Sequence, residues 1–485
     1  MTHQTGQPIA EQEQTSLALI SNPTSDSSQS FAQSESPESP FTSFRPDIPG
    51  RQPIALISVH SDPAAEIGSE EVGGHKVYVR QVGEALAKLG WQVDIFTRKT
   101  QQDDPVIVQH SPHCRTIRLV AGPQAFIPRD ELFEYMPQFV EAFQKFQSKE
   151  GTNYPLVHTN YWLSAWIGLQ LQESSNIELV HTYHSLGALK YKAVSQRPPI
   201  AETRLTVERQ ILEQASCIVA TSPQEQDTLQ SALSVGGTRS LVSEQGYIEV
   251  IPCGTDLDNF HSIPKFEARE RLGLDPAEQI VLYVGRFDPR KGIETLVRSL
   301  AMSEVRNRGK IRLVIAGGTD SESADEQERK RIAQIIQEVG LTEQTIFPGH
   351  LGHDVLPLYY AAADVCVIPS HYEPFGLVAI EAMACGTPVV ASDVGGLKFT
   401  VVPEETGLLV APQDTAAFAA AIDRILTDEL WATKLRKQAS ARVRQKFSWT
   451  RVGIQLSDLY RRLLARSIMD EQHSDIPATS LTLAS

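Results

Sequence analysis

The sequence predicts an α/β protein made of two doubly wound, Rossmann-like domains that face a central cleft. Short β-branched runs alternate with segments of helical apolar period along most of the chain, and this alternation starts a second time near residue 257. The chain has 485 residues, which is enough for two or three domains. Such alternation is typical of parallel sheets covered by helices on both faces.

Composition and charge exclude several classes of protein. The hydrophobic fraction of 41% and the charged fraction of 21% are those of a soluble globular protein. The net charge of −15 argues against a nucleic-acid partner. No apolar run approaches the ~18–20 residues of a membrane span. The five cysteines are scattered without metal-binding or disulfide spacing, which favours a cytoplasmic location.

The ends of the chain differ from the body. Residues 1–48 are acidic and rich in Ser, Gln, Pro and Thr, so we expect a disordered tail there. A second disordered tail is expected at residues 469–485. Between the tails, the first domain is predicted at residues 49–256 and the second at residues 257–446.

Thirteen strands are expected, each followed by a turn or a helix. In the first domain they are Ile54–His60, Gln92–Thr97, Thr116–Val120, Leu156–Tyr161, Glu178–His184, Cys217–Thr221 and Ile248–Pro252. In the second domain they are Ile280–Gly285, Ile311–Gly317, Thr345–Pro348, Val365–Pro369, Pro388–Ala391 and Leu408–Val410. Because doubly wound sheets bind ligands beyond the carboxyl ends of their strands, the residues after each strand are the candidates for function.

A glycine pair follows the first strand. A 12-residue stretch, Ser61–Val72, separates the strand from Gly73 and Gly74, where a helix is expected to begin. Glycines at a helix start let backbone N–H groups approach an anion, which the helix dipole also favours. A tight turn would need the same residues. The pair matches neither a Walker loop nor the three-glycine dinucleotide fingerprint.

Two basic residues follow the first strand of the second domain. Arg286 stands at the carboxyl end of the strand, and Lys291 stands at the start of the next helix. A forked guanidinium and a compact ammonium that converge there suit a diphosphate. Taken alone, the pair is equally consistent with solvated surface residues.

The most informative motif holds two carboxylates. Glu373 lies in the loop after the strand Val365–Pro369, Pro374 is expected near the first helical position, and Glu381 falls two turns along the helix. At 1.5 Å per residue the carboxylates would lie about 12 Å apart, too far for the acid pair of a glycoside hydrolase. They suit two hydroxyl clusters of one extended ligand, such as a hexose and a ribose. An acid in an apolar helix also needs a partner.

With these residues the chain resembles the retaining glycosyltransferases of the GT-B fold, family four in the sequence classification. Glu373 and Glu381 match the paired-Glu motif of that family, and Arg286 with Lys291 match its diphosphate clamp. The resemblance covers roughly residues 52–466. Within the family, the chain is most similar to the short, bacterial-type sucrose-phosphate synthases, and also to the inositol-phosphate N-acetylglucosaminyltransferase of mycothiol synthesis.

The resemblance implies a donor site for a nucleotide sugar in the second domain, with the acceptor in the first. Lys291, Arg286 and a backbone N–H of Gly74 would hold the diphosphate, and Glu373 would bind the hexose. The other residues implied in the donor site are His184 near the reaction centre, His350, Gly376 and Leu377 through the backbone, and Glu381 at the ribose. Of these, His184, Arg286, Lys291 and Glu373 would be catalytic.

The resemblance also implies a phosphorylated acceptor. Arg129, Tyr161, Ser185 and Arg204 match positions that hold its phosphate, which two guanidinium groups and hydroxyl donors suit. Lys76 stands where the mycothiol enzyme has an Asn beside inositol, and its charge favours fructose 6-phosphate.

The implied reaction moves glucose from UDP-glucose to fructose 6-phosphate with retention, giving sucrose 6-phosphate and UDP. A phosphatase would be the partner that consumes the product. No Asp-x-Asp triplet accompanies the motif, so no metal or other cofactor is expected for the chemistry. The family also implies that a helix at residues 447–468 crosses back to pack on the first domain.

Three alternatives stay open from the sequence. A nicotinamide-dependent oxidoreductase shares the doubly wound sheets but would need the missing fingerprint glycines. A non-catalytic sugar-binding protein would not need the charged clamp. A family-four enzyme with another acceptor, such as inositol phosphate, is the nearest alternative.

Overall fold

The computed structural model describes residues 51–65, 74–191, 197–232, 247–308, 310–318 and 324–474. The predicted tail at residues 1–48 lies outside this range. The predicted tail at 469–485 begins too early, because the last helix continues to Ser474. The rest of that tail lies outside the described residues.

The first domain is built on an eight-stranded sheet in the order β3-β4-β2-β1-β5-β6-β7-β8. All neighbouring strands are parallel except β3, which is antiparallel to β4. The strands are β1 (Gln52–Ile57), β2 (Trp91–Arg98), β3 (Ile107–Ser111), β4 (Cys114–Leu119), β5 (Leu156–Asn160), β6 (Glu178–Thr182), β7 (Cys217–Ala220) and β8 (Tyr247–Val250).

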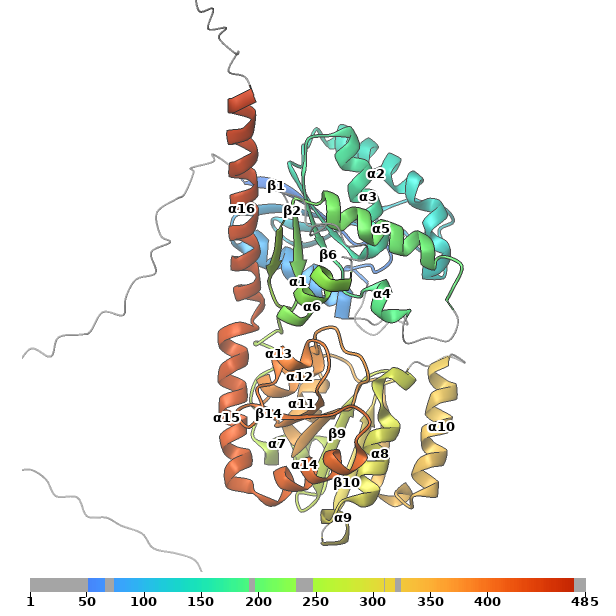
Figure 1. The fold of residues 1–485 in the computed structure, drawn as a ribbon, viewed down its shortest axis with the longest axis vertical. Helices are drawn as coiled ribbons and strands as arrows, with labels where there is room; N and C mark the ends of the chain where they lie inside the picture. Colours follow the sequence, from blue (N-terminus) through green and yellow to red (C-terminus); the bar gives the residue numbers. More distant parts are fainter. Residues whose placement is uncertain are drawn as a thin grey trace, which may run out of the picture. The chain divides into compact units, whose positions relative to one another are not determined.

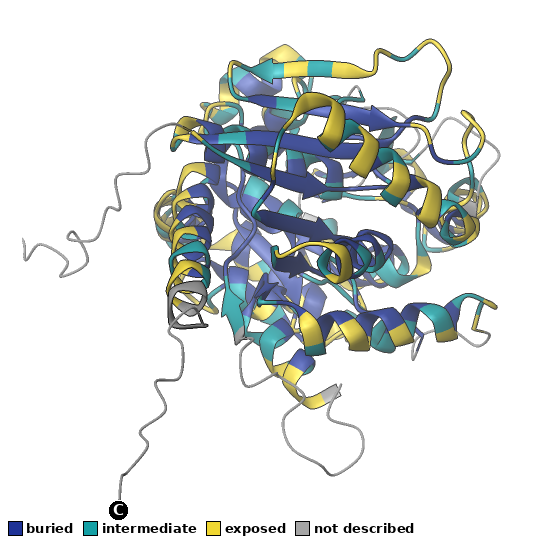
Figure 2. Cartoon of the chain, turned by 90° about the horizontal axis from the view of Figure 1, so that it is seen from above, coloured by how far each residue is buried: buried dark blue, intermediate teal, exposed yellow. Residues whose placement is uncertain are grey.

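Helices cover the faces of this sheet, and Figure 2 shows buried strands beneath helices whose outer sides are exposed. The helices are α1 (Gly74–Lys88), η1 (Arg129–Tyr135), α2 (Met136–Glu150), α3 (Tyr161–Ser174), α4 (Gly187–Lys190), α5 (Ala201–Gln214) and α6 (Pro223–Ala232). Helix α3 is apolar nearly all round, with nine buried residues. It is therefore enclosed between the sheet and its neighbours α2 and α5.

The second domain, which holds β9, β10 and β14 in Figure 1, is built on a six-stranded sheet. The sheet is wholly parallel, in the order β11-β10-β9-β12-β13-β14. Its strands are β9 (Gln279–Val284), β10 (Ile311–Ala316), β11 (Thr345–Gly349), β12 (Val365–Ile368), β13 (Val389–Ser392) and β14 (Gly407–Val410). Its helices are α7 (Lys265–Leu272), η2 (Pro289–Lys291), α8 (Ile293–Met302), α9 (Val305–Arg308), α10 (Ala324–Glu338), η3 (Thr342–Gln344), α11 (Leu356–Ala362), α12 (Leu377–Ala384), α13 (Leu397–Thr400), α14 (Thr415–Thr427) and α15 (Glu429–Lys446).

The last helix, α16 (Trp449–Ser474), packs against α1 of the first domain. The helices approach closely, since a Cβ at Gly453 would lie 2.8 Å from that of Ala85. Two polar contacts also join α16 to the strands β2 and β5. The Trp91 indole donates to the Ser457 hydroxyl at 2.8 Å, and the Tyr460 hydroxyl is hydrogen-bonded to a ring nitrogen of His158.

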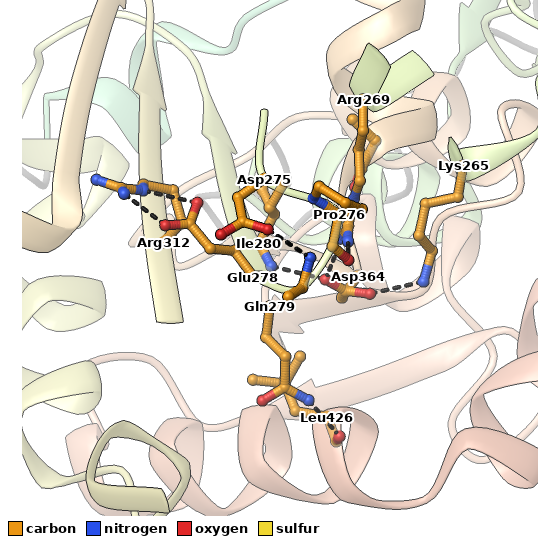
Figure 3. Close-up of polar contacts among 12 residues, drawn as sticks. Lys265, Arg269, Asp275, Pro276, Glu278, Gln279, Ile280, Arg312, Asp364 and Leu426 are labelled. Atoms are coloured by element: carbon orange, nitrogen blue, oxygen red, sulfur yellow. Dashed lines mark hydrogen bonds and ion pairs between the residues drawn. The ribbon is translucent and has the colours of Figure 1, made fainter. Parts of the chain in front are cut away.

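The amino edge of the second sheet carries a charged network centred on Asp364 (Figure 3). Its carboxylate accepts from Lys265 Nζ at 2.6 Å, from Arg269 Nη2 at 2.7 Å and from the backbone N–H of Ile280 at 2.6 Å. These bonds tie α7 to the start of β9 and β12. Because these charged groups pair with one another, we infer that they stabilise the second domain.

The predicted fold class of two doubly wound domains is confirmed, and each of the thirteen expected strands is present. The strand β3 was missed, because its five residues at the sheet edge alternate between exposed and half-buried. Several strands end earlier than expected. Strand β1 ends at Ile57 and β6 at Thr182, which leaves His60 and His184 in the turns that follow.

Candidate active site

The turn after β9 presents the two predicted phosphate-binding cations. The Arg286 side chain is 57% exposed, and its nearest carboxylate, Asp288, lies 3.8 Å away. Asp288 caps η2 by accepting from the backbone N–H of Arg290, and Lys291 is the last residue of that turn. Gly292 is then required, because its φ is 69° and a Cβ would lie 2.0 Å from the Pro369 carbonyl oxygen. This close approach brings Lys291 against the end of β12.

Lys291 is bonded directly to the first carboxylate of the paired-Glu motif. Its Nζ donates to Glu373 Oε2 at 2.6 Å, and both side chains are largely buried. The loop is held by the backbone as well: His371 N–H donates to the Arg290 carbonyl at 2.7 Å. The structure therefore brings together Lys291 and Glu373, which the sequence assigns to adjacent parts of one donor.

Glycines also fix the loop that carries Glu373. The Gly396 N–H donates to the Glu373 carbonyl at 3.0 Å, and a Cβ at Gly395 would lie 2.1 Å from that oxygen. The helix α12 begins at Leu377, with Gly376 at a φ of 94° as its N-cap. The expectation that Pro374 lies near the first helical position is wrong, because the left-handed turn at Gly376 delays the helix.

The second carboxylate has the partner that its apolar helix requires. Tyr360 on α11 donates its hydroxyl to Glu381 Oε2 at 2.9 Å. Burial nevertheless raises the pKa of Glu381 to about 7, and the bond from Tyr360 only partly offsets that rise. A carboxyl group that titrates near neutrality marks this place as a functional candidate.

The remaining residues predicted for the donor site lie at the ends of helices and strands. His350 is exposed and directly follows β11, Gly74 is the first residue of α1, and Leu377 is the first residue of α12. Helix starts leave backbone N–H groups without intrahelical partners, so both can face an anion or hydroxyl.

Two strands of the first domain end in a strained backbone. Tyr161 after β5 has a φ of 73°, and His184 after β6 has a φ of 57°. Left-handed conformations of non-glycine residues concentrate at functional sites. The His184 ring is held by a 2.9 Å hydrogen bond between its Nε2 and Asn160 Oδ1. Burial and the neighbouring imidazoles lower its pKa well below the ordinary value, so it is neutral.

Arg204 organises the predicted acceptor residues. The side chain of this residue on α5 is buried. Its Nη1 donates to the Tyr161 hydroxyl at 3.0 Å, its Nη2 donates to the Ser185 carbonyl at 2.6 Å, and its Nε donates to Glu208 at 2.7 Å. Glu208 also accepts from the Gly187 N–H at 2.9 Å. Arg204 thus fixes two of the predicted phosphate ligands.

Arg129 and Lys190 add two further positive charges to this group. Arg129 is exposed, and its guanidinium lies 5.7 Å from the centre of the Tyr161 ring. Lys190 ends α4. Burial, together with the charges of Arg129 and Arg204, lowers the pKa of Lys190 to about 8. Sequence reasoning missed Lys190, although its place six residues after His184 was a usable signal.

Lys76 lies deeper than the sequence suggests. It is the third residue of α1 and is only 3% exposed. Its contribution to acceptor binding stays a prediction.

The predicted donor and acceptor residues approach one another at Tyr372. This residue directly precedes Glu373, and the backbone N–H of Leu186, next to Ser185, lowers the pKa of its hydroxyl. Burial is the larger influence on this hydroxyl and raises the pKa of Tyr372 above its ordinary value.

Neither metal ligands nor membrane spans occur among the residues that the structure describes. There, no group of three or more His, Cys, Asp or Glu side chains could hold a metal ion. No helix in the same residues is long and apolar enough to cross a bilayer.

Comparison with known proteins assigns the family. Residues 72–259 match the profile "Glycosyltransferase Family 4", and residues 264–446 match "Glycosyl transferases group 1". The chain belongs to this family of glycosyltransferases. The sequence-based recognition of a GT-B enzyme is therefore confirmed, and an oxidoreductase is excluded.

Several relatives match this chain over most of its length and over nearly all of their own. The chain is 34% identical to D-inositol 3-phosphate glycosyltransferase of Corynebacterium efficiens over 411 residues, which is 84% of this chain and 94% of the relative. It is also 34% identical to the same-named protein of Rhodococcus erythropolis, over 84% of this chain and 91% of the relative.

Among solved structures, sucrose-phosphate synthase from Thermosynechococcus elongatus is 54% identical, with a TM-score of 0.77 over 86% of this chain and 100% of its own. Anabaena HepE, in complex with UDP and glucose, has a TM-score of 0.64 over 84% of this chain and 99% of its own at 20% identity, and shows the fold alone.

Proposed function

We propose that this glycosyltransferase moves glucose from UDP-glucose to fructose 6-phosphate with retention, which yields sucrose 6-phosphate and UDP. The observation that carries the proposal is the 54% identity to a sucrose-phosphate synthase over the full length of that protein. The inositol-phosphate enzymes, at 34% identity, are more distant. The cluster of Arg129, Lys190 and Arg204 supports a phosphorylated acceptor of either kind.

In this mechanism, negative charge grows on the β-phosphate of the donor as the nucleoside diphosphate departs. Arg286, Lys291 and the start of α1 at Gly74 would stabilise that charge. Lys291 has three N–H donors, of which Glu373 takes one, so it can hold the carboxylate and a phosphate together. The acceptor would attack from the leaving-group face and pass its proton to the departing phosphate oxygen.

The two carboxylates and His184 would orient the donor. Glu373 would accept from hexose hydroxyls and Glu381 from the ribose, while His184, held neutral by its surroundings, would contact the transferred sugar. With this division no carboxylate acts as a nucleophile.

A second acceptor is supported by a specific observation. The inositol-phosphate relatives match 84% of this chain, so transfer of N-acetylglucosamine to inositol phosphate is the alternative. Lys76 favours the sugar phosphate, since it adds a positive charge where that enzyme has an Asn.

The test is a panel assay. UDP-glucose, ADP-glucose and UDP-N-acetylglucosamine are each offered with fructose 6-phosphate, fructose and inositol phosphate, and the products are separated chromatographically. We expect sucrose 6-phosphate from UDP-glucose and fructose 6-phosphate only. Equal use of free fructose would contradict the assignment of the acceptor.

The proposed chemistry needs no metal ion, so transfer should persist in excess chelator, and a large loss of rate would contradict this. The proposal also places the reaction in the cytoplasm, with a phosphatase as the enzyme that consumes sucrose 6-phosphate.

A further inference from the structure

Two stretches of chain join the domains, residues 251–264 and residues 447–448, and they are bonded to each other. The Thr255 N–H donates to the Phe447 carbonyl oxygen at 2.7 Å. Thr255 also pairs with Ser448 as an isolated parallel bridge. Because the two stretches are tied together, a side chain packed on this pairing has a defined position relative to both domains.

A row of aromatic rings leads from the pairing to His184. The Trp449 ring, at the start of α16, packs on Gly254, where a Cβ would lie 2.7 Å from Cδ2 of the ring. The centre of the Trp449 ring lies 5.7 Å from that of Tyr78, on α1, at an interplanar angle of 74°. The Tyr78 centre in turn lies 4.7 Å from that of His184, at 76°. Both contacts are edge to face, which aromatic pairs favour, and both Trp449 and Tyr78 are buried.

His184 depends on its neighbours for its position. Its φ of 57° is a left-handed conformation, which persists in a residue other than glycine only where the surroundings enforce it. The hydrogen bond with Asn160 holds one ring nitrogen at 2.9 Å. The edge of the Tyr78 ring packs against the imidazole as well, so it restricts rotation of the imidazole about that bond.

The same pairing also contacts the loop that carries the first carboxylate of the paired-Glu motif. The Phe447 ring centre lies 5.9 Å from that of Phe375, again edge to face. Phe375 is two residues after Glu373. One pairing between the domains is therefore in ring contact with the Glu373 loop of the second domain and, through the row of rings, with His184 of the first.

We infer that Trp449 and Tyr78 are positioning residues, which hold the His184 imidazole in place relative to Glu373. The inference rests on the proposed function, in which His184 and Glu373 contact the transferred sugar. A misplacement of about 1 Å, caused by a substitution far from the chemistry, can lower a rate by about 10². Because both residues act through His184, their loss should lower kcat more than it changes either KM.

The experiment is a double-mutant cycle on kcat at saturating UDP-glucose and fructose 6-phosphate. Trp449→Leu and Tyr78→Leu should each lower kcat by roughly 10-fold to 100-fold, with both KM values within about threefold of wild type. In a His184→Ala background each should lower kcat by less than about threefold, because residues that act through one another are not additive. Trp449→Phe and Tyr78→Phe, which keep an aromatic ring, should restore kcat to within about threefold of wild type.

Trp91→Leu is the matched control. This tryptophan is also buried, and its ring packs edge to face on Tyr460 of α16 with centres 5.7 Å apart, instead of on Tyr78. Its loss should lower the unfolding midpoint, as the loss of Trp449 should, because each removes a large buried ring. It should nevertheless keep kcat within about threefold of wild type when measured well below the unfolding midpoint.

An undiminished loss of kcat from Trp449→Leu in the His184→Ala background would overturn the inference, as would wild-type kcat in both Leu variants. An equal loss in Trp91→Leu, or wild-type kcat in His184→Ala, would also overturn it. Trp449→Met takes the place of the Leu variant if that variant does not fold. Failure of the proposed function is distinct: the wild type would then transfer nothing to fructose 6-phosphate, and the cycle is run with the substrates that the panel assay identifies.

Discussion

Lys291 Nζ lies 2.6 Å from Glu373 Oε2, across 82 residues of sequence. The bond joins the turn after β9 to the loop after β12, and these are neighbouring strands of the second sheet. A cation that is already extended toward its place loses less side-chain entropy when the donor binds. In the proposed mechanism the ion pair would therefore prepare the donor site before substrate arrives.

Replacing Lys291 by Ala should lower kcat by roughly 10²–10³, the range for removing a preorganised group that stabilises transition-state charge. The measurement is kcat at saturating UDP-glucose and acceptor. Arg298→Ala is the matched control. Arg298 lies on α8 and pairs with Glu294 of that helix, away from the turn that carries Lys291. A kcat within threefold of wild type in the Lys291 variant would contradict the role of this residue.

Glu381 should make donor binding depend on pH. Its pKa of about 7 means that the carboxylate, which accepts from hydroxyls, is lost as the pH falls below neutrality. The KM for UDP-glucose should therefore rise between pH 7 and pH 5.5. Glu381→Gln should weaken donor binding and remove this dependence.

Ionisation of Glu381, which favours donor binding, should lower the stability of the folded protein. A carboxyl whose pKa is raised on folding binds its proton more tightly in the folded protein, so its ionisation costs stability above pH 7. Glu381→Gln should consequently raise the unfolding midpoint at pH 8 and have less effect at pH 5. A lower midpoint at pH 8 would contradict the assigned cost.

Arg129 and Lys190 should discriminate phosphorylated from free acceptors. Each charged hydrogen bond contributes about 1.5–3 kcal/mol, so Arg129→Ala and Lys190→Ala should each raise the acceptor KM by roughly 10-fold to 150-fold. The KM for UDP-glucose is the internal control. Because the pKa of Lys190 is about 8, its charge is lost as the pH rises beyond that value. The acceptor KM should therefore rise above pH 8 in the wild type, and less so in Lys190→Ala.

Arg204 differs from these two cations, because its side chain supports the first domain. Removing it would leave Glu208 buried without its ion-pair partner, which costs about 3–5 kcal/mol. Arg204→Met should therefore lower the free energy of unfolding measured in urea. Arg204→Met with Glu208→Met should recover most of that loss, and a double variant no more stable than the single one would contradict the pairing.

The order of elements was predictable, because apolar periodicity is a local property of the sequence. Most of the thirteen expected strands lie in largely buried runs, while three of the five residues of the edge strand β3 are polar and none is buried. Arg286, Lys291, Glu373 and Glu381 could be named because each follows a strand or lies on the helix after it, and the paired-Glu spacing matches a family.

The contacts between these residues were beyond sequence reasoning. The left-handed backbone at Tyr161 and His184 depends on packing around them, since residues other than glycine rarely adopt it. The charge of Lys190 acts on Arg129 and Arg204 through space, and the ring contacts of His60 and His75 join two elements. Such relations depend on tertiary structure, which periodicity and spacing do not contain.

Asp364 can show whether charges at the amino ends of the strands in the second sheet serve stability alone, while those at the carboxyl ends serve donor binding. It lies at the amino edge, where Lys265, Arg269 and the Ile280 N–H all donate to it (Figure 3). Asp364→Ala should lower the free energy of unfolding by up to about 3–5 kcal/mol, because two partly buried cations lose their partner. Asp364→Asn, which keeps hydrogen-bond acceptance, should lose less of the free energy of unfolding.

The same variants should leave donor binding unchanged. Just below the unfolding transition, the folded fraction of each variant should retain the wild-type KM for UDP-glucose, because Lys291 and Glu373 lie beyond the opposite ends of these strands. A changed KM with unchanged stability would mean that the two edges are coupled.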